Sequence, residues 1–252
     1  MRPSLSYLIC CAERTGSALL SDALIATGVA GRPQSYFNHA AHFNPRFVRM
    51  LGNAKDDDKY LDKVVAAATT PNGVFGAKVH WQHFLSFVAK IDRSLPADGG
   101  VAGRSVPASL RMRFPDLRYI WLTRRNAVAR AISHYRAKKT GQWQLDARWI
   151  TDDTGGEGEP SFDFDAIDAF VRYGEAENAR WRQYFAAYAI TSLELTHEEL
   201  VKDIAGTVRT VLEFLDIPVE NVQLPPPSLR PQTDGRSREW EARYRQMCAE
   251  DE

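Results

Sequence analysis

A short polar loop at residues 13–17 has the residue types of an anion-binding site. It follows an apolar run at residues 7–11 that is typical of a buried parallel strand, and a helical pattern begins at Ser17. Backbone N–H groups at a helix start have no intrahelical partners, and the helix dipole adds positive potential there. Gly16 lets a ligand approach closely, and Thr15 adds a hydroxyl group. Arg14 supplies a forked cation suited to phosphate or sulfate oxygens. The segment alone is equally compatible with a plain strand-to-helix turn.

A second basic segment follows another apolar run, at residues 117–123. Arg125 lies just before a predicted helix at residues 126–139, and Ser133 lies eight residues further along. Eight residues of helix rise about 12 Å, so a long arginine side chain leaning along the helix can meet a phosphate that the serine also contacts. A strand-end arginine and an ordinary helical serine are the structural alternatives.

The first loop differs from that of a P-loop nucleoside triphosphatase. The pattern G-x-x-x-x-G-K-[ST] is absent, and no lysine stands before the turn formed by Thr15, Gly16 and Ser17. A magnesium-dependent phosphotransferase is therefore disfavoured.

Strand and helix patterns alternate along the whole chain. Apolar runs predict strands at residues 7–11, 74–79, 117–123 and 192–195, and helices are predicted at 17–28, 83–91, 126–139, 165–188 and 204–215. Residues 38–70 look mostly helical, and a basic helix is predicted at the end of the chain. This order predicts an α/β fold with a central parallel sheet flanked by helices. Because no repeat or linker interrupts it, we predict a single domain over residues 1–252.

The composition excludes several classes of partner. Lys plus Arg and Asp plus Glu number 32 each, which gives no indication of nucleic acid as a partner, so any anion site must be built locally. No apolar stretch approaches the roughly 20 residues of a membrane-spanning helix. The three cysteines, Cys10, Cys11 and Cys248, form no disulfide framework, which favours a reducing cytoplasm. No metal-ligand spacing is present. A homodimer is compatible with the sequence, which does not fix the oligomeric state.

Taken together, the two basic segments resemble those of the sulfotransferases that use 3'-phosphoadenosine-5'-phosphosulfate (PAPS). In that family the first loop holds the 5'-phosphosulfate, and an arginine and a serine of the second segment hold the 3'-phosphate. The resemblance therefore implies two sets of cofactor contacts: Arg14, Thr15, Gly16, Ser17 and Ala18 in the first, and Arg125 and Ser133 in the second.

A closer resemblance is to the bacterial trehalose 2-sulfotransferase-like, or Stf0-type, group. Residues 26–37 resemble its acceptor-side segment, residues 70–78 its second strand, and residues 236–244 its last helix. The similarity runs from about residue 6 to 245 and leaves the loops around 95–110 and 140–165 uncovered. It implies a P-loop-like sulfotransferase fold, PAPS as co-substrate, 3'-phosphoadenosine-5'-phosphate (PAP) as product, and a small hydroxyl-bearing acceptor such as a sugar, a glycolipid or another alcohol.

Further nucleotide contacts follow from the same resemblance. Residues 195–200 resemble a family turn, which places His197 where an aromatic ring meets the adenine. Arg230 and Arg236, near the end of the chain, are within reach of the 3'-phosphate in this scheme. A surface histidine and solvated arginines are the structural alternatives.

The sequence departs from the trehalose-type pattern at the expected general base. Those enzymes use a glutamate after Pro-Gln, whereas Ser35 follows Pro33-Gln34 here, and serine is no base near neutral pH. His80, at the end of the strand that starts at residue 74, resembles the catalytic histidine of the eukaryotic cytosolic sulfotransferases. An imidazole of pKa near 6.5, lowered by Lys78, suits proton removal. His39, His42, His83 and Glu13 are the other candidate bases.

The remaining roles complete this hypothesis. Arg14 offsets charge on the bridging oxygen of the leaving nucleotide, and Lys78 steadies the sulfuryl oxygens. The predicted acceptor pocket is lined by Gln34, Ser35, Tyr36 and Trp81. The sequence thus predicts a PAPS-dependent sulfotransferase. The alternative is a catalytically impaired PAP- or PAPS-binding protein of the same fold, because Ser35 replaces the expected glutamate.

Overall fold

A parallel sheet forms the centre of the molecule, as the alternating pattern predicts. The computed structural model describes residues 2–37, 51, 57–91, 105–143, 158, 160–219 and 234–250. Within these residues the sheet has four strands in the order β2-β1-β3-β4. The strands are β1 (Leu5–Cys11), β2 (Val74–His80), β3 (Leu117–Thr123) and β4 (Ser192–Thr196). Every strand pair is parallel, so the predicted α/β fold class is confirmed.

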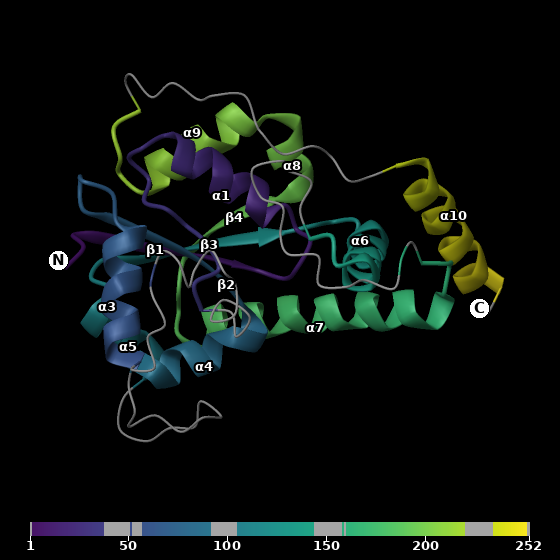
Figure 1. The fold of residues 1–252 in the computed structure, drawn as a ribbon, viewed down its shortest axis with the longest axis horizontal. Helices are drawn as coiled ribbons and strands as arrows, with labels where there is room; N and C mark the ends of the chain where they lie inside the picture. The colour runs from purple at the N-terminus through teal and green to yellow at the C-terminus, as the bar shows by residue number, and fades with distance from the viewer. Residues whose placement is uncertain are drawn as a thin grey trace.

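Helices cover both faces of the sheet (Figure 1). One face carries α1 (Ser17–Ala26), α8 (His197–Lys202) and α9 (Ile204–Phe214), and the other carries α3 (Asp57–Ala68), α4 (Trp81–Ile91), α5 (Val106–Arg113) and α7 (Phe164–Ala187). Alternate residues of the fully buried β1 point to opposite faces of the sheet. Tyr7 and Ile9 pack in the core under α1, α8 and α9, whereas Leu8 and Cys10 pack in the core under α3, α4, α5 and α7. A strand buried on both faces must be apolar throughout, which is why it reads as a continuous hydrophobic run.

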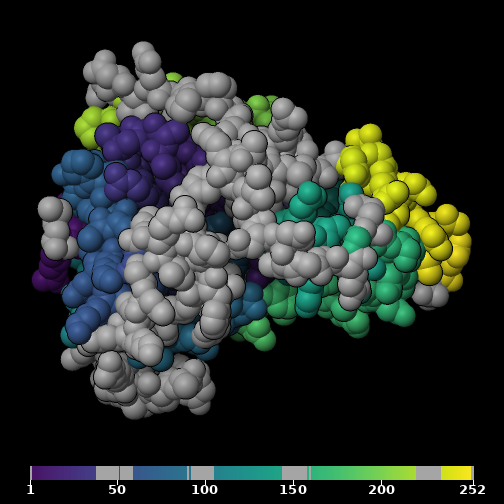
Figure 2. Space-filling view, viewed as in Figure 1, coloured from purple at the N-terminus to yellow at the C-terminus, as the bar shows by residue number. Residues whose placement is uncertain are grey.

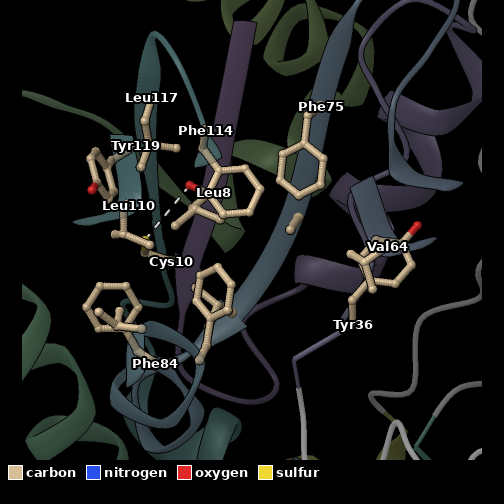
Figure 3. Packing of buried hydrophobic residues seen from close by; sticks show 14 of the residues in the cluster. Leu8, Cys10, Tyr36, Val64, Phe75, Phe84, Leu110, Phe114, Leu117 and Tyr119 are labelled. Carbon is tan, nitrogen blue, oxygen red and sulfur yellow. Dashed lines mark hydrogen bonds between the residues drawn. The ribbon is translucent and has the colours of Figure 1, made fainter. Parts of the chain in front are cut away.

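The core between the sheet and α3, α4 and α5 is rich in aromatic rings. Phe75 of β2 stacks on Phe114, which follows α5, with 4.7 Å between the ring centroids. Figure 3 shows these two rings beside Leu8 of β1, with Phe84 of α4 at the lower edge of the cluster. This packing fixes β2, and with it the strand end that carries Lys78 and His80.

A third core lies beyond the carboxyl ends of the strands. Here α6 (Ala127–Thr140) packs on α7 and on α10 (Gly235–Glu250), with Ile132, Trp240 and Tyr244 among the buried residues. Figure 2 shows α10 beside α6 and α7 at this end of the molecule. No helix in the described part combines the length and apolar character that crossing a bilayer requires.

Two helical predictions need correction. The helix expected from residue 83 begins two residues earlier, at Trp81, directly after β2 ends at His80. Helix α5 was not predicted, and of the stretch at residues 38–70 the structure describes one helix, α3, and the single helical residue Leu51. Residues 38–50 and 52–56 of the predicted helical stretch lie outside the described residues, as do residues 92–104 and most of 144–159, which belong to the two loops that the family resemblance leaves uncovered.

Candidate active site

The parallel register brings the polar segments to one edge of the sheet. Cys11, the last residue of β1, is paired with His80 of β2 and with Leu122 of β3, and Thr123 is paired with Thr196 of β4. The loop after β1, the end of β2, and the segments that follow β3 and β4 therefore converge. Ligands of open α/β sheets bind at this edge.

The loop between β1 and α1 is shaped by two left-handed residues. Arg14 has a φ of 66° and Gly16 a φ of 86°. A Cβ at Gly16 would lie 2.6 Å from Nδ1 of His197, so this ring covers the loop and only glycine fits beneath it. Helix α1 starts directly after this turn, at Ser17, with Ala18 in its first turn. Thr15 and Ser17 are both buried. The predicted anion loop and its helix are thus next to each other, with His197 packed on them.

Arg14 is held in place by contacts to distant parts of the chain. Its Nε donates to Oγ of Ser133 on α6 at 2.9 Å, and its Nη1 donates to the carbonyl of Trp143. Nη1 of Arg124 donates to the Arg14 carbonyl at 3.2 Å. The guanidinium is therefore fixed across the space between the first loop and α6.

The site brings two largely buried cations, Arg14 and Lys78, close to the start of α1. Burial, and then the neighbouring Arg124, lower the pKa of Arg14 to about 10. Burial also lowers the pKa of Lys78, and Arg14 adds to this. In the described part of the chain no group accepts a hydrogen bond from the Lys78 ammonium. Two crowded cations beside a helix N-terminus provide a strong site for a doubly or triply charged anion.

The two residues predicted to share the 3'-phosphate lie in different surroundings. The side chain of Arg125 is 64% exposed and forms an ion pair with Glu199 at 2.6 Å. The backbone N–H groups of Arg125 and Asn126 donate to the carboxylate of Glu198. The structure therefore brings Ser133 to Arg14, and it brings Arg125 to α8.

His80 lies at the end of β2, where the sequence places it, with a largely buried ring. Its Nδ1 is 3.5 Å from Oε1 of Glu13, and the side chains are 12% and 8% exposed. Burial, followed by Lys78 and His83, lowers the pKa of His80 to about 3. The ring is consequently neutral at physiological pH, which is the form that a general base needs.

The predicted acceptor residues lie in two places: Gln34 and Ser35 beside the end of β2, and Tyr36 and Trp81 in or against the aromatic core. Gln34 forms a parallel bridge with Ala77, and its carbonyl accepts from the N–H of Lys78 at 3.0 Å, so Ser35 begins beside the end of β2. Tyr36 is 1% exposed and its hydroxyl donates to the Arg32 carbonyl. Trp81 packs edge-on against Trp181, with 4.9 Å between the centroids.

The other predicted contacts lie nearer the end of the chain. Arg236 is exposed in the first turn of α10. Arg230 lies outside the described residues, as do the candidate bases His39 and His42. Burial, and then Arg124, lower the pKa of His197 to about 4.

Several polar residues around His80 were not singled out from the sequence. Tyr173 of α7 donates to Glu13, and Arg130 of α6 donates to two carbonyls of α7. His134 is 7% exposed against Phe170, and burial lowers its pKa to about 4. In the sequence, the only feature that could have drawn attention to His134 is that it directly follows Ser133. Tyr173 and Arg130 lie inside predicted helices, and nothing in the sequence marked them as site residues.

We expect the free energy of unfolding to fall as the pH drops from 6.5 to 4.5. His80, His134 and His197 have lowered pKa values in the folded protein, so the unfolded chain binds more protons here. Glu177 opposes them, because burial and Glu13 raise its pKa to about 7. Three histidines against one glutamate give a net uptake of about two protons, or about 3 kcal/mol per pH unit. Near pH 4.5 the lowered pKa values of Glu198, Glu199 and Asp234 add to this uptake.

Urea unfolding at pH 7, 6 and 5 measures this slope. His134→Phe keeps an aromatic ring against Phe170 and should reduce the slope by up to about one proton. A free energy of unfolding that stays constant from pH 7 to 5 would contradict the expectation.

Known sulfotransferases match the chain over almost its whole length. A family model described as Stf0 sulphotransferase matches residues 6–247. A trehalose 2-sulfotransferase of Mycolicibacterium smegmatis is 28% identical, covering 98% of this chain and 96% of that protein. One of Mycobacterium tuberculosis is 25% identical, covering 95% and 94%. The crystal structure of a sulfotransferase from Alicyclobacillus acidocaldarius superposes with a TM-score of 0.50 at 16% identity, covering 98% of this chain and 92% of that chain, which supports the fold.

Proposed function

Because the chain belongs to the Stf0 sulphotransferase family, we propose that it moves the sulfuryl group of PAPS to a hydroxyl of a small acceptor. The observation that carries the choice of donor is the fixed position of Arg14, between the loop before α1 and Ser133. Arg14, Lys78 and the first N–H groups of α1 form a cationic site for a phosphosulfate group.

Charge stabilisation is the main task of these groups. In an in-line transfer, the acceptor oxygen attacks sulfur while charge gathers on the bridging oxygen of the leaving nucleotide. In this scheme Arg14 and the α1 N–H groups offset that charge, and Lys78 contacts the sulfuryl oxygens. Since Arg14 is already fixed by Ser133 and Trp143, no reorganisation is needed during the reaction.

His80 is the proposed general base. It lies on the same strand end as Lys78, two residues further on, and is neutral because burial lowers its pKa to about 3. A neutral imidazole can accept the proton of the attacking hydroxyl through its free nitrogen. Gln34, bonded to the backbone of Lys78, brings the acceptor-side segment to the same place.

A sugar hydroxyl is the acceptor that we favour. Both relatives reported above carry the name trehalose 2-sulfotransferase, although this chain has Ser35 after Pro33-Gln34. That serine also favours the second candidate function, a PAP- or PAPS-binding protein with impaired catalysis. Both candidate functions require that the protein bind PAP or PAPS. Only the sulfotransferase requires that it transfer the sulfuryl group to an acceptor.

We expect PAP to raise the melting temperature much more than ATP at equal concentration. The proposed 3'-phosphate site, which includes Arg125 and Ser133, recognises a group that ATP lacks, and stabilisation follows RT ln(1 + [L]/Kd). Differential scanning fluorimetry with each nucleotide measures the difference. Equal stabilisation by PAP and ATP would remove the basis for the donor assignment.

The contribution of Arg125 can be tested separately. Arg125→Ala should remove most of the preference for PAP, because a charge-assisted contact to phosphate is worth about 1.5–3 kcal/mol. Arg113→Ala is the matched control, since this arginine of α5 pairs with Asp62 away from the site. An unchanged preference in Arg125→Ala would assign the 3'-phosphate to other cations.

A further inference from the structure

Glu13 is a buried carboxylate in the centre of the proposed site. The residue is 7% exposed, although it lies in the loop directly before Arg14. Its Oε1 accepts from Nε2 of Gln82 at 2.5 Å and from the hydroxyl of Tyr173 at 3.3 Å. The same oxygen lies 3.5 Å from Nδ1 of His80. Residues from β2, α4 and α7 thus converge on one carboxylate oxygen.

A purely structural carboxylate would be expected to have a different set of partners. Burial of a carboxylate is costly unless a cation pairs with it and both oxygens are hydrogen-bonded. In the described residues, His80 is the one ionisable cation-forming group within 4.0 Å of Glu13, and Oε2 has no hydrogen-bond partner. The carboxylate is therefore directed at the imidazole and is not satisfied by an arginine or lysine.

We infer that Glu13 is the positioning residue for His80, an inference that rests on the proposed role of His80 as base. Glu13 accepts a hydrogen bond from Nδ1–H of His80, which leaves the lone pair of Nε2 for the acceptor hydroxyl. The carboxylate then stabilises the imidazolium that forms during transfer. This is the task of the third member in other base-orienting arrangements.

The proton and electron movements balance with PAPS and the acceptor alone. The O–H bond of the acceptor breaks, and its proton goes to Nε2 of His80. A new bond forms between the acceptor oxygen and sulfur, while the bond between sulfur and the phosphate oxygen of PAPS breaks. The electron pair of that bond leaves with PAP. Glu13 keeps its charge throughout, and its proximity lowers the energy of the charged ring.

The surroundings explain why an anion is needed at this point. Lys78 on the same strand and His83 on α4 disfavour a charged His80 ring, as does burial. Arg14 from the loop and His134 from α6 are also nearby. Tyr173 and Glu177, both on α7, interact electrostatically with Glu13, which raises their pKa values. Glu13 is the carboxylate that contacts the ring directly, so it offsets the cations where the new charge forms.

Glu13→Gln tests the inference because it keeps the shape and removes the charge. We expect kcat to fall about 10–10³-fold, with PAP stabilisation unchanged. Glu13→Asp should recover part of the loss. Glu175→Gln, an exposed position of α7, is the matched control and should retain full activity. Full activity of Glu13→Gln alongside an inactive His80→Ala would overturn the inference and leave the proposed base intact.

A double-mutant cycle separates action through His80 from independent action. Adding Glu13→Gln to His80→Ala should cost nothing further, because the residues act as a unit. An equal loss in both backgrounds would show that Glu13 acts without His80. Full activity of His80→Ala would instead refute the proposed base, a separate result.

The tautomer of His80 supplies a readout that needs no turnover. ¹⁵N NMR of histidine-labelled protein should show the Nδ1–H form in the wild type, assigned by loss of the signal in His80→Ala. Glu13→Gln should shift His80 towards the Nε2–H form, because the amide can also donate to Nδ1. An Nε2–H tautomer in the wild type would contradict the inference even if Glu13→Gln failed to fold.

Discussion

Replacing His80 with alanine should lower kcat by about 10²–10⁴-fold, the usual loss when general-base assistance is removed. PAP affinity should change little, because the ring adjoins Glu13 and the acceptor-side end of β2, while the nucleotide contacts lie on Arg14 and α6. Single-turnover sulfation of a sugar acceptor, followed by mass spectrometry, measures the rate, and scanning fluorimetry with PAP measures binding.

His83→Ala is the matched control for this prediction. His83 also lies near the site, with 6.4 Å between its ring centroid and that of His80, and it was a candidate base in the sequence. It should retain activity within about fivefold, since loss of a nearby non-reacting group is far smaller than loss of a base. An inactive His83→Ala together with an active His80→Ala would mean that the base lies on α4 and not on β2.

The pH profile gives the same prediction a second test. The pKa of His80 is lowered to about 3, so the ring stays in its basic form as the pH falls through 6.5. The acidic limb of kcat/KM should therefore lie well below pH 6.5. From residue types alone a limb close to 6.5 is expected, and burial in the folded protein is the main reason for the difference.

Ser35→Glu in the His80→Ala background examines the trehalose-type alternative. The Gln34 carbonyl is hydrogen-bonded to Lys78, so the residue after it begins beside the end of β2. A carboxylate introduced there should restore part of the lost rate if both bases serve the same acceptor hydroxyl. The catalytically impaired alternative instead requires that wild-type protein show no turnover with any acceptor.

Arg14→Met should lower kcat/KM for PAPS by about 10²–10³-fold, comparable to the removal of a preorganised donor that stabilises developing charge. The side chain is fixed at both ends of its guanidinium by Ser133 and Trp143, so its charge is in place before the nucleotide arrives. Arg14→Lys keeps the charge but cannot form both contacts, and we expect an intermediate loss.

The stability of Arg14→Met provides the contrasting measurement. Burial and Arg124 disfavour the charged Arg14, as its lowered pKa of about 10 indicates. Without ligand, the variant should therefore be as stable as the wild type or more stable, while its stabilisation by PAP is lost. Arg113→Met should change neither property. A destabilised Arg14→Met that still binds PAP would assign a structural role to the arginine.

The strands and the first loop were predictable because their causes are local. A strand that is buried on both faces must be apolar, and β1, β2 and β3 were recognised as apolar runs for this reason. The end of β1 at Cys11 and the start of α1 at Ser17 follow from polar and glycine residues between them. Parallel pairing then places His80 at the edge that holds this loop.

Other features depend on partners that are distant in sequence. Helix α4 begins at Trp81, two residues earlier than its local pattern indicates, and this tryptophan packs edge-on against Trp181 of α7. Arg125 and Ser133 share a helix pattern, yet Ser133 is bonded to Arg14, 119 positions away. The residues next to α4 and next to Ser133 in the sequence cannot indicate these contacts, because the contacts depend on which helices the sheet brings together.

The sequence by itself determined the fold class, the loop that precedes α1, and the residue types available to bind an anion and accept a proton. Only the tertiary structure decided how those residues are paired and charged. The sequence offered Glu13 as one of several candidate bases, and packing of α4 and α7 placed it against His80. The physical reason is that hydrophobic periodicity acts over a few residues, whereas desolvation and charge interactions depend on every element that surrounds a buried group.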